Sequence, residues 1–120
     1  MRADGAPAPV GPYSQAVVCG DLVFCSGQLG LDPATGAMAQ GAAAQARQAL
    51  ANLQAVLQAA GSSLDRAIKV TVYMTDLAHF PEVNKAYADF FEPPFPARTA
   101  IQVAALPKGG EVEIDVIALR

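Results

Sequence analysis

The sequence predicts an α+β protein in which two helices pack on one face of a single mixed β-sheet. Several segments alternate apolar and polar residues with a period of two, which is typical of strands. Two other segments repeat apolar residues every three to four positions, which is typical of amphipathic helices. In chain order, the predicted elements are strand, strand, helix, strand, helix, strand and strand (ββαβαββ).

The first half of the chain contains a predicted hairpin and the longer helix. Residues 16–24 predict two strands joined at Gly20-Asp21, a turn pair in which glycine tolerates a positive φ. Residues 40–60 lack proline, and Gly61 follows where a glycine commonly ends a helix. No Ser, Thr or Asp marks the start of this helix clearly. Its apolar stripe consists of Ala46, Leu50, Leu53, Leu57 and Ala60.

The second half predicts a strand at 67–75, a helix at about 81–91 that prolines terminate, and strands at 97–104 and 111–119. An extra short strand near Met38 is an open alternative. Because strand–helix–strand crossovers are right-handed, both helices are expected on the same side of the sheet. The other face then has no cover and mixes apolar with polar side chains, so we expect a homo-oligomer.

Size and composition fit one domain spanning residues 1–120, with 52% hydrophobic and 16% charged residues. A net charge of −3 without a Lys/Arg cluster argues against nucleic acid as the main partner. No run of about 18 apolar residues predicts a membrane span. Residues 1–5 lack the basic and apolar regions of a secretory signal, so we expect a cytoplasmic protein.

The two cysteines are expected to be free and buried. In a two-residue hairpin, Cys19 pairs with Leu22 and Cys25 lies opposite Ala16, so the two cysteines do not face each other. Free thiols fit a reducing compartment. One histidine and no Cys/His cluster leave no plausible zinc site, so no metal is expected.

Polar side chains on the last two strands suggest a binding site. These positions are Arg98, Ala100 and Gln102 on the first strand, and Glu111, Glu113 and Asp115 on the second. The opposite, apolar faces carry Ile101 and Val103 on the first strand, and Val112, Ile114 and Val116 on the second. A guanidinium and a carboxylate on neighbouring strands would bind a small carboxylic acid and direct a water molecule at it. The pattern alone does not select one of the three acids.

Short motifs are spread in order along nearly the whole chain. They are Gly11–Ala16, Leu22–Leu29, Asp32-Pro33 with Gly36, Gln45–Leu53, Val70–Tyr73 with Thr75–Leu77, Val83-Asn84, Phe95–Arg98, Leu106-Pro107 and Val112–Ile114. Together they resemble the RidA (YjgF-type) family of enamine/imine deaminases.

The resemblance implies a homotrimer with a chorismate-mutase-like α+β fold and ligand sites in clefts between subunits. It also implies hydrolysis of 2-aminoacrylate, of its tautomer 2-iminopropanoate, and of 2-iminobutanoate to 2-oxo acids and ammonia, without a cofactor. That reaction protects pyridoxal-phosphate enzymes from damage. The small-molecule partner would be an imino or keto acid.

By position in these motifs, the resemblance assigns carboxylate binding to Arg98 and placement of the attacking water to Glu113. A guanidinium suits the first role because its planar fork makes two parallel hydrogen bonds to a carboxylate. The remaining cleft residues implied are Tyr13, Ser26, Gly27, Asn84 and Ala100. Gly27 would act through its backbone.

Ala100 is a departure, because many family members have Cys at this position. If that cysteine acts mainly through its backbone, Ala100 costs little, whereas a thiol role would change activity or substrate range. Imine hydrolysis needs water and orientation rather than a thiol nucleophile, which favours the first interpretation.

Each candidate also has a structural interpretation. Without the resemblance, Arg98 would be interpreted as a solvated or structural strand residue. Glu113 would be interpreted as a solvent-facing residue, like Glu111 and Asp115. Asn84 could be a surface helix residue, Tyr13 an interface aromatic and Ser26 a strand-end cap.

Two other functions remain open at this stage. One is non-catalytic binding or sensing of small carboxylates in the same cleft. The other, suggested for relatives of this family, is RNA cleavage or chaperone-like action, which the acidic balance and the lack of a His pair disfavour.

Overall fold

The computed structural model describes residues 2–120, so Met1 of the N-terminal segment lies outside the described residues. It confirms the α+β class, with two α-helices and a six-stranded mixed sheet. The elements are β1 (Ala16–Cys19), β2 (Leu22–Cys25), β3 (Gln28–Leu29), α1 (Ala42–Ala59), β4 (Ala67–Met74), α2 (Phe80–Ala88), β5 (Ala97–Gln102) and β6 (Val112–Leu119).

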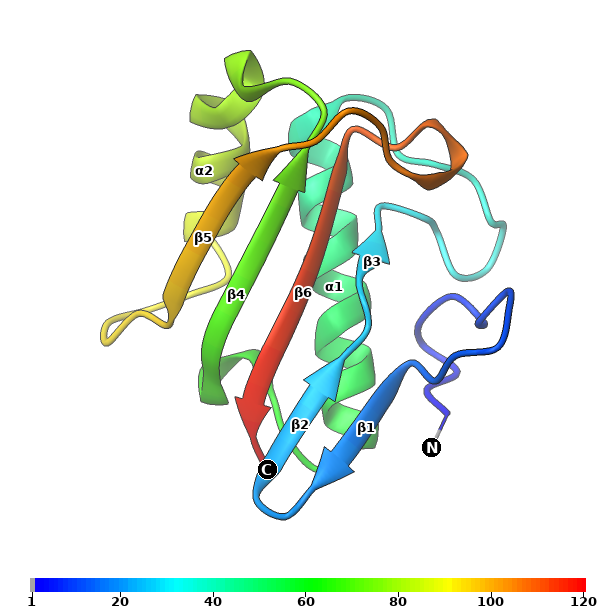
Figure 1. Cartoon of the computed structure of the whole chain (residues 1–120), viewed down its shortest axis with the longest axis vertical. Coiled ribbons are helices and arrows are strands. Elements are labelled where there is room, and N and C mark those ends of the chain that lie inside the picture. Colours follow the sequence, from blue (N-terminus) through cyan, green and yellow to red (C-terminus); the bar gives the residue numbers. More distant parts are fainter. Residues whose placement is uncertain (1) are drawn as a thin grey trace.

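The strands are ordered β1-β2-β6-β4-β5, and β3 also pairs with β6 (Figure 1). Among the strands of the described residues, β4 and β5 alone are paired in parallel, and the other pairs are antiparallel. β3 is an addition to the predicted order. It consists of two residues, Gln28 and Leu29, which pair with Ile114 and Glu113. Near Met38 there is one isolated bridge to Leu31 rather than a strand.

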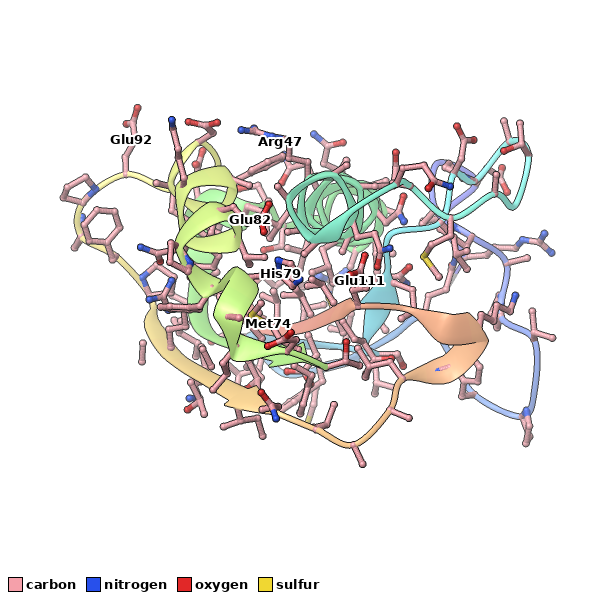
Figure 2. All side chains as sticks on the ribbon, turned by 90° about the horizontal axis from the view of Figure 1, so that it is seen from above. Arg47, Met74, His79, Glu82, Glu92 and Glu111 are labelled. Carbon is pink, nitrogen blue, oxygen red and sulfur yellow. The ribbon has the colours of Figure 1, made fainter. Side chains whose placement is uncertain are left out.

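Both helices cover the same face of the sheet, as predicted. Figure 1 shows α1 and α2 behind the strands, and Figure 2 shows the helices and the sheet as two layers. The predicted stripe of α1 is buried in the core, where, among the strands, α1 packs mainly against β6 and also against β2 and β3. Met74, at the end of β4, is fully buried there. This apolar contact is the main source of stability, because burial removes roughly 25 cal/mol per Å² of apolar surface from water.

The opposite face of the sheet, which we call the open face, is not covered by any helix of residues 2–120 (Figure 1). Val17 is paired with Phe24, and Phe24 with Ile117, so these three side chains form an apolar band across β1, β2 and β6. Val17 is 56% exposed and Phe24 42% exposed. Leu119 adds a further exposed apolar side chain. The prediction of an uncovered face with apolar and polar residues is confirmed.

One prediction about the last two strands was wrong. β5 and β6 are not neighbours, because β4 lies between them. The inward face of β5 also differs from the expectation. Arg98 and Ala100 pair with the buried Val70 and Val72 and therefore lie on the helix side, whereas Ile101 lies on the open face and is 40% exposed.

The hairpin register is as predicted, with Cys19 opposite Leu22 and Cys25 opposite Ala16. Both cysteines are free, and Cys25 is buried. Cys19 is exposed, contrary to the prediction, because it lies at the end of the edge strand β1 on the open face. Burial, and to a lesser extent the nearby Asp115, raises the pKa of Cys25 to about 12. In the described part of the chain, no helix combines the length and apolar character needed to cross a bilayer.

Buried amides attach the segment after β2 to α1. Asn52 is fully buried, and its Nδ2 donates to the carbonyl oxygens of Leu29 (3.1 Å) and Leu31 (2.9 Å). Its Oδ1 accepts from Gln48 at 2.9 Å. Gly30 lies so close to α1 that a Cβ there would be 2.6 Å from Cα of Gln45. These contacts fix the position of β3 beside β6.

Asn52→Leu should therefore destabilise the protein by about 2–4 kcal/mol, because two buried carbonyl groups lose their donor. Chemical denaturation measures the change. Gln58→Ala, an exposed change on the same helix, is the control and should stay within about 0.5 kcal/mol of the parent. A loss below about 1 kcal/mol for Asn52→Leu would contradict this role.

Candidate active site

The structure contains a cleft of roughly 680 Å³ between the N-terminal segment, the β2–β3 junction and the loop before β6. It lies on the side of β6 that is away from β4 and β5. Four of the predicted site residues line it: Tyr13, Ser26, Gly27 and Glu113. The structure therefore brings together three separate parts of the sequence: Tyr13, the adjacent Ser26 and Gly27, and Glu113.

Glu113 lies directly against Gly27. A Cβ added at Gly27 would be 2.7 Å from Oε2 of Glu113 and 2.8 Å from its Cδ. No side chain larger than hydrogen fits there without displacing the carboxylate. Glycine at position 27 thus leaves room for the Glu113 carboxylate beside the backbone, and this contact supports the assignment of both residues to one site.

The structure distinguishes Glu113 from its acidic neighbours, which the sequence pattern could not do. Glu111 is hydrogen-bonded to Gln45 of α1, through its carboxylate at 3.2 Å and its backbone N–H at 2.7 Å. Asp115 accepts a hydrogen bond from the hydroxyl of Tyr73 at 3.0 Å. Glu113 instead lines the cleft. Of the three acids, it is the one placed to act on a ligand there.

The environment of Glu113 raises its pKa above the ordinary value of 4.5. The main cause is burial, which disfavours the charged form, and the negative charge of Asp115 adds to it. A carboxylate with a raised pKa binds a proton more readily near neutral pH. That property suits a group that takes a proton from water.

The other two cleft residues differ in their local roles. Ser26 Oγ donates to the backbone oxygen of Ser14 at 2.6 Å, and the Ser26 N–H donates to Gln15 at 2.9 Å. Ser26 thus attaches the N-terminal segment to β2, and its hydroxyl oxygen can still accept a hydrogen bond. Tyr13 is 52% exposed at the edge of the cleft, so its hydroxyl is accessible.

Arg98 lies elsewhere, against α2. Its Nη1 donates to Oδ1 of Asn84 at 2.6 Å. Its guanidinium carbon is 4.7 Å from the ring centroid of Tyr87 and 5.4 Å from that of Phe80. The ion pairs within residues 2–120 do not include Arg98, so its partner here is a neutral amide rather than a carboxylate.

The predicted site residues therefore form two groups in one chain. Arg98 and Asn84 lie on the helix side at the β5 edge, whereas Glu113 lies on the open face of β6, with Tyr73 of β4 beside it. The expectation that Arg98 and an acid would lie together on neighbouring strands was wrong for a single chain.

Ala100 belongs to the first group. It lies two residues after Arg98 on the same face of β5 and is half-buried against the core. Its methyl group leaves the surface beside Arg98 apolar. Sequence reasoning did not identify Phe80 and Tyr87 as contacts of Arg98. Phe80 lies four residues before Asn84 and Tyr87 three residues after it, so this spacing could have indicated that all three share one helix face.

Among residues 2–120, no three His, Cys, Asp or Glu side chains are grouped as metal ligands would be. The chemistry available in the described residues is that of a cation with unsatisfied charge, a carboxylate with a raised pKa, and a cleft. These features, on an α+β sheet covered on one face, are those of a protein with a pocket for a small ligand.

Comparison with known proteins identifies the family. The model of the endoribonuclease L-PSP family matches residues 3–120, so this chain belongs to that family, which includes the RidA/YjgF proteins. The bovine protein named 2-iminobutanoate/2-iminopropanoate deaminase is 50% identical over 116 residues, covering 96% of this chain and 85% of the relative.

Two crystal structures agree closely. RidA from an Antarctic Psychrobacter species has a TM-score of 0.97 and 48% identity, covering 100% of this chain and 98% of that chain. TdcF from E. coli, solved with bound serine, has a TM-score of 0.95 and 40% identity, covering 100% and 97%. The family prediction made from the sequence motifs is confirmed.

The raised pKa of Glu113 gives a testable pH dependence. A raised folded-state pKa stabilises the fold below the ordinary value of 4.5, and this contribution is lost as the pH rises through the folded pKa. The glutamine in Glu113→Gln is uncharged at every pH. The variant should therefore melt at a higher temperature than the parent at pH 7.5, and this difference should disappear at pH 4, where Glu113 of the parent is also protonated. Thermal unfolding at the two pH values measures it.

The control for this experiment is Glu92→Gln, because Glu92 is exposed. It should show no comparable difference between the two pH values. A Glu113→Gln protein that melts below the parent at pH 7.5, or by the same margin at both pH values, would refute the effect of burial on this carboxyl.

Proposed function

We propose that this protein is a cofactor-independent deaminase that hydrolyses small 2-imino acids and their enamine tautomers, 2-iminopropanoate and 2-iminobutanoate among them, to 2-oxo acids and ammonia. One observation is central: Arg98 is held by the neutral Asn84 and by aromatic rings, so its charge is not neutralised by a carboxylate. Such a guanidinium is prepared for the carboxylate of a substrate. The name of the bovine relative and the serine bound in TdcF are consistent with a ligand of this class.

The reaction needs orientation and one proton carrier. Arg98 binds the carboxylate and thereby fixes the imine carbon. Glu113 takes a proton from water as the oxygen adds to the imine carbon and delivers that proton to the imine nitrogen, giving a neutral carbinolamine. It then takes the proton of the new hydroxyl group and passes it to the amine nitrogen, so that the C–N bond breaks, the C=O bond forms and ammonia leaves. Water supplies the oxygen, and no electrons are transferred.

A site with both residues requires two copies of the chain, because Arg98 and Glu113 lie on opposite faces of one sheet. The surface carrying Arg98 in one copy would meet the cleft carrying Glu113 in the next. Such a contact joins two different surfaces, and its repetition closes a ring when the rotation between copies allows closure. We propose the homotrimer implied by the sequence motifs as that ring.

The open face supports this assembly. Its apolar band, Val17, Phe24 and Ile117, continues to Leu119 and lies in the part of the sheet beside the cleft. Side chains of this kind, edged by polar groups, are typical of the core of a subunit interface.

The name of the family, endoribonuclease L-PSP, suggests a second function. The geometry gives it less support. The one histidine, His79, is exposed at the start of α2, where its Nδ1 lies 2.6 Å from Glu82 (Figure 2). It is not in the cleft. A non-catalytic binding role would use the same Arg98 but would give no task to Glu113, which lines the cleft.

We place this activity in the cytoplasm. Both thiols are free, and the exposed Cys19 would be preserved in a reducing compartment. The imine substrates arise there from pyridoxal-phosphate dehydratases, according to the family resemblance.

Replacing Arg98 should abolish efficient hydrolysis. Arg98→Ala is expected to lower kcat/KM by at least about a hundredfold, since two charge-assisted hydrogen bonds are lost, and Arg98→Lys should also be poor. The measurement couples the protein to a dehydratase and follows 2-oxo acid release. Arg47→Ala, which removes an exposed arginine paired with Asp89, is the control. Full activity of Arg98→Ala would refute the proposal.

The two-copy site can be tested by mixing inactive chains. Arg98→Ala and Glu113→Gln chains, unfolded together and refolded in equal amounts, should recover about a quarter of wild-type sites, because a ring pairs each Arg98 with the neighbour's Glu113.

Wild-type chains refolded with an equal amount of the Arg98→Ala/Glu113→Gln double variant provide the comparison. They should also give about a quarter of the sites if two copies are needed, and about half if one chain suffices. A mixture of the single variants that is no more active than either alone would contradict the two-copy site.

A further inference from the structure

We propose that Phe80 and Tyr87 are positioning residues for Arg98. Their aromatic rings hold the guanidinium where it binds the substrate carboxylate, before the substrate arrives. The inference rests on the proposed function, because that function gives Arg98 its ligand. It adds two residues that neither the sequence motifs nor the comparisons assign to the site.

The spacing of the residues places them together. Phe80, Asn84 and Tyr87 are separated by four and three positions, so they lie on one face of α2. All three contact the same guanidinium: Asn84 by a hydrogen bond, and the two rings from 5.4 and 4.7 Å. One helix face thus surrounds a side chain from the neighbouring edge strand β5.

The ring of Tyr87 is itself fixed. Tyr87 is 7% exposed, and its ring stacks on Phe91 with centroids 4.5 Å apart. A cation over a buried ring is attracted more strongly than one over a solvated ring, because water competes less for the charge. Arg98 is exposed on an edge strand, so without this support its long side chain would sample many rotamers.

The ring rather than the hydroxyl is the important part of Tyr87. Within the described residues, its buried hydroxyl oxygen has no hydrogen-bond partner. It therefore contributes no bond that positions another group. Neither ring neutralises the charge of Arg98. A carboxylate side chain would also fix the guanidinium, but it would compete with the carboxylate of the substrate for the same hydrogen bonds. Preorganisation of this kind reduces the ordering cost of binding.

The test compares ring removal with ring retention in the coupled deaminase assay. Tyr87→Leu should raise KM about tenfold and weaken inhibition by 2-oxobutanoate similarly, with a smaller change in kcat. Phe80→Leu, at the longer distance, should raise KM about threefold. Tyr87→Phe should restore KM to within about twofold of the parent, because it retains the ring.

Phe90→Leu is the matched control, since Phe90 is half-buried just after α2 and has no cation–π contact with Arg98. Its KM should not change. Circular dichroism and light scattering report whether each variant folds and assembles. If Tyr87→Leu does not fold, the KM of Phe80→Leu alone tests the positioning role.

An unchanged KM in the folded leucine variants, or a Tyr87→Phe protein as impaired as Tyr87→Leu, would overturn the positioning role while leaving the deaminase intact. A wild-type protein without hydrolysis or 2-oxobutanoate binding would instead refute the proposed function, and this inference with it.

Discussion

The alternation of side chains along β4, β5 and β6 determines where every reactive group lies. Val70 and Val72 face the helices, and the parallel register places Arg98 beside Val70 on that same side. On β6, the buried residues alternate with Glu113, which faces away from the helices. Moving one of these side chains to the other face would require a one-residue shift in register, which would also move the buried apolar side chains of that strand out of the core. The apolar core therefore fixes Arg98 and Glu113 on opposite faces of the sheet.

Activity and assembly are consequently linked in the function we propose. The core on the helix side is complete within one chain, whereas the open face exposes Val17, Phe24 and Leu119 to solvent. Association would bury these side chains and bring a cation from one copy to a carboxylate of another. The same hydrophobic effect that stabilises the interface would complete the site.

The sequence predicted the elements whose signals are local. Gly20 set the hairpin register, and the apolar repeat of Leu50, Leu53 and Leu57 set the buried face of α1. The sequence did not predict features that depend on which elements pack together in three dimensions. The apolar character of Ile101 favoured a position facing the core. However, β5 is an edge strand, and Arg98 with its contacts to α2 occupies part of its inner face. Glu113 was chosen by family resemblance, and the hydrogen bonds that occupy its neighbours are visible only in three dimensions.

The most direct measurement of the central claim is a crystal structure of the assembled protein with 2-oxobutanoate bound. We predict that the carboxylate of the ligand lies on Arg98 of one copy and that its carbonyl carbon is directed at Glu113 of the next copy, beside Gly27. A ligand held by Arg98 with no Glu113 nearby, or in the cleft with no arginine from another copy, would contradict it.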